Sequence, residues 1–245
     1  MNINFPGQKI LDEYNHFIII IYTILILSDM LKSNLKSLLH SCLIWSIFLV
    51  FFTNCSAQYR PSQFFREDWK EIPVATPVTQ AHVVNKNLTL TLYGPGRDSI
   101  RKSHHDSPVD DPWYIWPGLC KGNWAVTLKS NSAYVDLTGF GKILWRSKQA
   151  GLRELHLVLK LADGSWLVSV QGEGKSKDWK ITEFNISDIE WYSLNIETVI
   201  ERRPVIKPDL SKVDEIGFTD LMTGGGSDAC SRLDWIEVYG KSVGR

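Results

Sequence analysis

The chain has 245 residues, and its 27 Lys and Arg balance 27 Asp and Glu, so the formal net charge at pH 7 is zero. This balance argues against a nucleic-acid-binding protein, because such proteins usually carry a basic excess. With 44% hydrophobic and 22% charged residues, the composition is that of a globular chain and excludes both a disordered chain and a polytopic membrane protein. Ten tryptophans are many for this length.

The apolar residues are concentrated near the N-terminus in two runs, 17–27 and 38–52. Both runs are shorter than the roughly 18 to 20 residues that a membrane-spanning helix needs. The second run follows Lys32 and Lys36 and precedes small residues that end at Ala57, a pattern typical of a secretory signal that is cleaved after Ala57.

This pattern predicts that translation begins at Met30 and that residues 1–57 are an N-terminal extension and signal peptide. The mature protein is then periplasmic or secreted, with no stable membrane span after cleavage. Two alternatives are that both runs are membrane anchors and that Cys55 is lipidated.

The cysteines are divided between the leader and the mature chain. Cys42 and Cys55 lie in the leader, whereas Cys120 and Cys230 remain after cleavage. An exported chain with two remaining cysteines is a candidate for one disulfide, here Cys120–Cys230. Two free buried thiols are the alternative. The leader contains as many lysines as acidic residues, so the mature chain is also neutral.

A proline-containing lead-in segment, 58–80, is followed by short β-like runs between turn residues. The runs are expected at 82–93, 124–128, 133–137, 142–146, 155–161, 166–170, 179–184, 216–219 and 233–239. Asp163-Gly164 between two alternating runs predicts a hairpin. Helical periodicity is limited to short turns near 187–191 and 211–213. Many short strands at regular spacing predict an all-β fold, with a single β-sandwich over residues 81–245.

The last run ends in residues that resemble a known family. Residues 213–221 and 231–240 look like the closing strands of galactose-binding-like jelly rolls, and the order of 134–146, 152–170 and 179–187 is similar over roughly residues 80–240. The resemblance implies a jelly roll and a carbohydrate partner, because members are commonly carbohydrate-binding modules and in a minority polysaccharide lyases. The chain also resembles small exported proteins of bacterial polysaccharide-degradation systems, some of which look like oligosaccharide lyases or dehydratases.

Residues 94–124 do not have a strand pattern and are expected to form a long loop rich in His, Asp and aromatic residues. Loops longer than about 15 residues in a compact domain are usually functional or disordered. His104 and His105 are adjacent, with Asp106 and Asp111 close by. A neighbouring Asp can fix the tautomer of a histidine and raise its basicity.

This loop suggests an elimination reaction on a uronate. Such a reaction needs a base, an acid for the departing oxygen, and cations that neutralise the carboxylate. His104 or His105 is the expected base and Tyr114 the acid. The expected substrate-binding residues are Asp106, Asp111, Trp113, Trp116, Lys121, Arg146 and Lys148.

Other interpretations of the same residues remain open. No spacing matches a zinc motif, so a catalytic metal and a cofactor are not expected. A structural calcium is an alternative use of the acidic residues of this loop, together with Glu67, Asp68 or Glu237. The loop can also be a capping loop whose tryptophans pack on the sandwich. Arg232 and Asp234 are expected to pair with each other.

Two functions from different classes follow. In the first, an exported carbon–oxygen lyase or dehydratase acts on acidic, uronate-containing oligosaccharides. In the second, a non-catalytic carbohydrate-binding jelly roll stacks Trp113, Tyr114 and Trp116 on sugar rings. The partner in both cases is an oligosaccharide or polysaccharide, not a nucleic acid.

Overall fold

The computed structural model describes residues 18–23, 60–119, 122–222 and 230–245. The chain divides into two compact units, Met1–Gln58 and Tyr59–Arg245. In the first unit only residues 18–23 are described, and they are helical. No helix within the described ranges is long and apolar enough to cross a membrane.

Several predictions concern residues outside the described ranges. These are the start at Met30, the cleavage after Ala57, lipidation at Cys55, and the roles of Cys120 and Lys121. Cys230 is buried, but its pairing with Cys120 stays a prediction.

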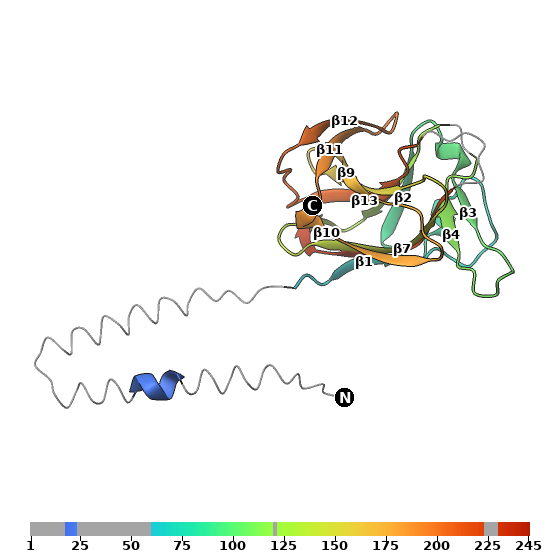
Figure 1. Cartoon of the computed structure of the whole chain (residues 1–245). Coiled ribbons are helices and arrows are strands. Elements are labelled where there is room, and N and C mark those ends of the chain that lie inside the picture. Colours follow the sequence, from blue (N-terminus) through green and yellow to red (C-terminus); the bar gives the residue numbers. More distant parts are fainter. Residues whose placement is uncertain (1–17, 24–59, 120–121, 223–229) are drawn as a thin grey trace, which may run out of the picture. The chain divides into compact units, whose positions relative to one another are not determined.

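The second unit consists of two antiparallel sheets that form two layers in Figure 1. The six-stranded sheet has the order β10 (Lys180–Asn185), β7 (Lys142–Gln149), β14 (Ser231–Tyr239), β4 (Tyr114–Trp116) and β3 (Arg101–Ser103), and β1 (Gln63–Glu67) also pairs with β14.

The nine-stranded sheet has the order β12 (Ile200–Val205), β11 (Trp191–Asn195), β9 (Trp166–Glu173), β8 (Leu155–Leu161), β13 (Val213–Thr219), β5 (Ala125–Ser130) and β2 (Leu88–Tyr93). β6 (Ala133–Asp136) pairs with β13 and with β15 (Lys241–Gly244). Three short 3-10 helices connect strands: η1 (Gln80–His82), η2 (Arg97–Ser99) and η3 (Ile186–Asp188). The all-β jelly-roll sandwich that the sequence predicts is therefore confirmed.

The core lies between the sheets and explains much of the tryptophan content. Along β7 the side chains alternate between buried and half-buried, so that Ile143 and Trp145 point inward. Trp69, Trp124 and Trp191 are also buried. Because a buried aromatic side chain removes a large apolar area from water, these four indoles are a major source of stability.

The lead-in segment is part of the sandwich. β1 pairs with the C-terminal half of β14, and Phe65 and Trp69 are buried in the core. The fully buried carboxylate of Glu67 accepts hydrogen bonds from the backbone N–H groups of Trp69, Val84 and Asn85, at 2.9, 2.7 and 2.9 Å. Burial raises the pKa of Glu67, and these three donors oppose the rise.

The outer face of the nine-stranded sheet is partly covered by its own chain. The turn after β11 places Val199 in a second apolar cluster with Ala125, Val158 and Val168. The amide of Asn123 donates a hydrogen bond to the Val199 carbonyl at 2.8 Å. The outer face of the six-stranded sheet is the other broad surface of the sandwich.

Residues 94–124 differ from the expected continuous loop. They contain two three-residue strands, β3 and β4, which pair with each other and join β14 through Ile115 and Leu233. This pairing attaches the predicted site to the outer edge of the six-stranded sheet.

Candidate functional site

A bulge in β14 determines which side chains reach the outer face of the six-stranded sheet. The register with β7 shifts between Leu233 and Trp235. Because a bulge adds one residue to a strand, Asp234 and Trp235 both lie on the outer face, whereas Leu233 is fully buried. Simple alternation along the strand would place Leu233 and Trp235 on one face, and the bulge separates them.

Asp234 pairs with Arg146 rather than with Arg232. The Arg146 guanidinium donates to the Asp234 carboxylate at 2.7 Å and lies 5.5 Å from the ring centre of Trp179. Burial raises the pKa of Asp234 to about 6, although Arg146 opposes the rise. The predicted pairing of Arg232 with Asp234 is therefore wrong, and Arg146 is already neutralised by a carboxylate.

An open groove of about 580 Å³ lies at the other end of this face, where Lys142 and Tyr239 are register partners. We call it the Phe140 groove, and its main lining residues are Phe140, Lys142, Glu183, Asn185, Asp188 and Tyr239. It therefore combines two aromatic rings with an amine, an amide and two carboxylates.

A tight turn exposes Phe140. Gly139 has a φ of 67°, in the left-handed region that favours glycine. A Cβ on Gly141 would lie 2.4 Å from the Leu137 carbonyl oxygen, so only glycine fits there. Phe140 between them is 52% exposed, which is unusual for a phenylalanine in a protein with a large core.

The polar groups of the Phe140 groove are held in place. The Lys142 ammonium pairs with Glu183 at 2.7 Å and lies 5.2 Å from the ring centre of Tyr239. The Tyr239 hydroxyl donates to Glu237 at 2.9 Å. These contacts fix the tyrosine ring while leaving Asn185 and Asp188 exposed.

The structure brings together three of the predicted site residues. The Asp111 carboxylate lies 2.8 Å from His105 Nδ1 and also accepts the His105 backbone N–H at 2.9 Å. The Tyr114 hydroxyl lies 3.2 Å from the same ring nitrogen. The His105 side chain is 61% exposed, so its Nε2 edge is accessible.

Tyr114 is a poor candidate for direct contact with a substrate. It is only 2% exposed and packs against Trp179, with ring centres 5.5 Å apart. Burial raises its pKa to about 12, and the charge of Arg232 opposes the rise. The phenol stays protonated at neutral pH, but its burial keeps it from direct contact with a sugar.

His104 and Trp113 do not join this group. Their rings stack at 4.4 Å, and the Lys102 ammonium lies 3.6 Å from the Trp113 ring centre. Both groups lie against the indole of the half-buried Trp113, so little of its ring surface is open to a sugar. The buried His104 Nδ1 has no hydrogen-bond partner.

The remaining predicted residues are dispersed over this surface. Lys148 lies on β7, 3.7 Å from Asp178. Trp116 is half-buried, and its indole N–H donates to Ser103 at 2.6 Å. Asp106 is exposed in the loop before Asp111.

The carboxylates outside the loop that were considered for calcium have other partners. Asp68 and Glu237 both pair with Arg66, and Glu67 accepts three backbone N–H groups. Within the described ranges, no group of three or more His, Cys, Asp or Glu is placed to hold a metal ion.

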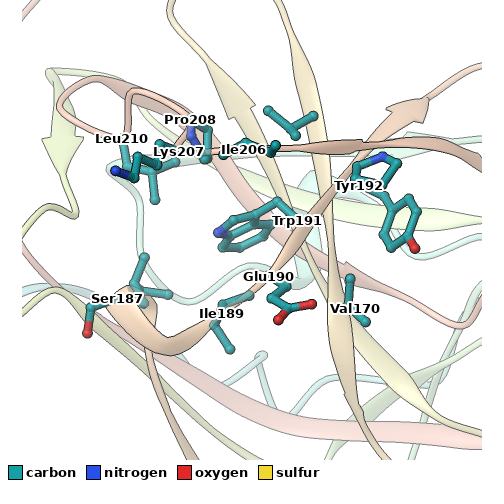
Figure 2. Close-up of a pocket in the computed structure, with 13 residues that line it drawn as sticks. Val170, Ser187, Ile189, Glu190, Trp191, Tyr192, Ile206, Lys207, Pro208 and Leu210 are labelled. Atoms are coloured by element: carbon teal, nitrogen blue, oxygen red, sulfur yellow. The ribbon is translucent and has the colours of Figure 1, made fainter.

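A second groove of about 450 Å³ adjoins the first through Ser187. In Figure 2 the Trp191 indole lies in the middle of its lining, between Ile206 and Pro208 on one side and Ile189 and Glu190 on the other. Trp191 is only 3% exposed, so it offers little ring surface to a ligand.

Sequence reasoning missed Phe140 and Arg232. The sequence around Phe140 could have predicted an exposed ring, because an aromatic residue between two glycines in a polar turn cannot be buried easily. Arg232 had no such signal, since its position near Tyr114, 5.9 Å from the ring centre, depends on the pairing of β14 with β4.

No model of a known protein family matches the chain, and a search of curated proteins also finds no match. Among solved structures, the chain is similar to the family 11 carbohydrate-binding module of the cellulosomal cellulase Lic26A-Cel5E of Clostridium thermocellum. The identity is 12% over 76% of this chain and 97% of the module, with a TM-score of 0.41.

A family 29 carbohydrate-binding module complexed with cellulohexaose is similar at 14% identity over 69% of this chain and 92% of the module, with a TM-score of 0.39. An exo-beta-agarase is similar at 10% identity over 66% of this chain and 24% of the agarase, also with a TM-score of 0.39. The predicted likeness to carbohydrate-binding jelly rolls is thus found among solved structures.

Proposed function

We propose that the protein binds an oligosaccharide or polysaccharide on the outer face of its six-stranded sheet, with the Phe140 groove as the principal site. The observation that carries this proposal is the composition of the groove, in which the exposed ring of Phe140 lies beside Tyr239, Asn185 and Asp188. A sugar ring has an apolar face and a rim of hydroxyl groups, which such a groove complements.

The Trp191 groove is a weaker candidate for this function. Its floor is a buried indole, and its walls are mainly Ile, Val, Leu and Pro side chains. A sugar in that groove would leave several hydroxyl groups without partners, which costs free energy when they lose water.

Substitution Phe140→Ala tests the proposal, measured by calorimetric titration with a panel of neutral and acidic oligosaccharides. We expect affinity to fall about tenfold or more, because a central aromatic contact commonly contributes over 1 kcal/mol to binding. Ile206→Ala is the matched control, since Ile206 is 86% exposed but lines the Trp191 groove.

The control variant should bind with unchanged affinity. If Ile206→Ala weakens binding and Phe140→Ala does not, the Trp191 groove is the site and the proposal is wrong. Thermal unfolding of both variants should match that of the unmodified protein, because both side chains are largely in solvent.

Elimination on a uronate-containing oligosaccharide is a second candidate, favoured by the contact of His105 with Asp111. We propose that His105 Nε2 removes the proton from the carbon beside the carboxylate while Asp111 orients the ring. The electron pair of that C–H bond forms a C=C bond, the bond from the next carbon to the leaving oxygen breaks, and water protonates that oxygen.

Incubation with an oligouronate tests this second candidate by the ultraviolet absorbance of the unsaturated product. We expect His105→Ala to abolish the product and His104→Ala to retain it, because His104 is stacked on Trp113 away from Asp111. Absence of product from the unmodified protein, together with glycan binding, would leave the non-catalytic function alone.

A further inference from the structure

Three cations and one tryptophan form a row across four neighbouring strands. The row lies at the end of the outer face opposite the Phe140 groove. Lys148 on β7 is the register partner of Arg232 on β14. The pairing of Leu233 with Ile115 places Arg232 beside Trp116 on β4, and Trp116 is in turn the partner of Arg101 on β3. We call Arg101, Lys148 and Arg232 the cationic row.

These cations make few ion pairs. Within the described part of the chain, neither Arg101 nor Arg232 makes an ion pair, and the only acid paired with Lys148 is Asp178, whose side chain is 83% exposed. The loop that carries Lys175 and Lys177 adjoins the row, because the Ser176 N–H donates to the Gln149 carbonyl at the end of β7.

The rest of the outer face is balanced. Arg146 is paired with Asp234, Lys142 with Glu183, and Arg66 with both Asp68 and Glu237. Since the whole chain has no net charge, the row is a local excess of positive charge and not part of a basic surface. Local cations of this kind attract anions even on a neutral protein.

An aromatic ring lies inside the row. The Arg101 guanidinium is 5.8 Å from the ring centre of Trp116, which is half-buried between Arg101 and Arg232. Guanidinium groups bind carboxylate and sulfate-like oxyanions through paired hydrogen bonds. A ring beside such groups fits a sugar that carries an anionic substituent.

We propose that the cationic row binds the carboxylate or sulfate groups of an acidic polysaccharide whose chain continues into the Phe140 groove. This inference rests on the proposed carbohydrate binding and specifies its substrate class. The two ends are compatible with one extended chain, because Lys142 and Lys148 are six residues apart on β7, or about 20 Å.

The test compares the full chain with the double substitution Arg101→Gln and Arg232→Gln. Its ligands are an oligouronate, a sulfated galactan oligomer and a neutral β-glucan oligomer, measured by calorimetry at low and high salt. The double substitution Arg202→Gln and Arg203→Gln on the edge strand β12 is the matched control, because it removes the same charge from exposed positions of the other sheet.

We expect the first double variant to lose about tenfold or more in affinity for an acidic oligomer and to lose most of its salt dependence. Its affinity for the neutral oligomer and its thermal midpoint should not change, and the control variant should match the unmodified protein. If the double variant loses affinity for the oligouronate, the row binds carboxylates. If it loses affinity for the sulfated oligomer, the row binds sulfates.

Unchanged acidic-glycan affinity in the first double variant, with a loss in Phe140→Ala, overturns the cationic row and leaves carbohydrate binding intact. No binding of any oligosaccharide overturns both. A short single-stranded DNA that competes as strongly as the acidic oligomer makes the row a general polyanion site, which also contradicts this inference.

Discussion

Asp234 is a nearly buried carboxyl group that the β14 bulge places beside Arg146. Its pKa of about 6, against an ordinary 3.8, means that burial outweighs the attraction of Arg146. The folded protein therefore holds a proton that the unfolded chain releases between pH 4 and 6. The stabilisation is complete below about pH 4 and is lost as the pH rises through about 6.

Asp234→Asn should remove this pH dependence, because an amide cannot ionise. Urea unfolding from pH 4 to 7 should show the unmodified protein losing on the order of 2 kcal/mol relative to Asp234→Asn. Asp209→Asn is the control and should show no relative change from pH 4 to 7, because hydrogen bonds from Ser211 lower the pKa of Asp209 from 3.8 and move its pH dependence below this range. A gain in relative stability of the unmodified protein with rising pH would mean that Arg146 outweighs burial.

The sequence predicts local side-chain neighbours better than distant ones. His105 and Asp111 are six residues apart in one loop, and their contact follows from that closeness. Trp179 and Arg232 contact Tyr114 from segments that are far away in the sequence. No spacing rule links them, so the sequence did not indicate that Arg146 pairs with Asp234, whereas Lys148 pairs only with the exposed Asp178.

Among the elements, strands with one buried face were predictable. β8 and β9 alternate on either side of Asp163-Gly164, and the structure pairs them as a hairpin. β12 has four consecutive exposed residues followed by a proline, so it carries no alternation and its pairing with β11 was missed. β3 and β4 have only three residues each, too few for a periodic signal.

At the scale of the whole molecule, the most informative feature of the composition is the net charge of zero. A neutral chain excludes a general electrostatic field, so any preference for an acidic ligand must come from a local arrangement of cations. Alternation predicts that β7 and β14 have an outer face, but only the pairing of β14 with β4 joins Lys148, Arg232 and Arg101 across it. The cationic row can therefore be identified only from the folded structure and not from the sequence.

The domain boundary at residue 81 gives a prediction for the whole molecule. A chain that begins at residue 58 retains β1, Phe65 and Trp69, whereas a chain that begins at residue 81 loses two buried aromatic side chains. Removal of one such side chain costs about 3 to 5 kcal/mol, and a whole domain has only about 5 to 15 kcal/mol of stability. We expect the longer chain to unfold cooperatively and the shorter one to lack fixed tertiary structure.

Near-ultraviolet circular dichroism and thermal unfolding distinguish these outcomes, because ordered tryptophans give the signal. Removal of residues 241–245 from the longer chain is the control, since it deletes strand β15 but no buried side chain. That chain should keep its tertiary signal at a lower thermal midpoint. If the chain that begins at residue 81 unfolds as cooperatively as this control, β1 is peripheral to the sandwich, and the buried contacts of Phe65 and Trp69 do not determine whether the two sheets assemble.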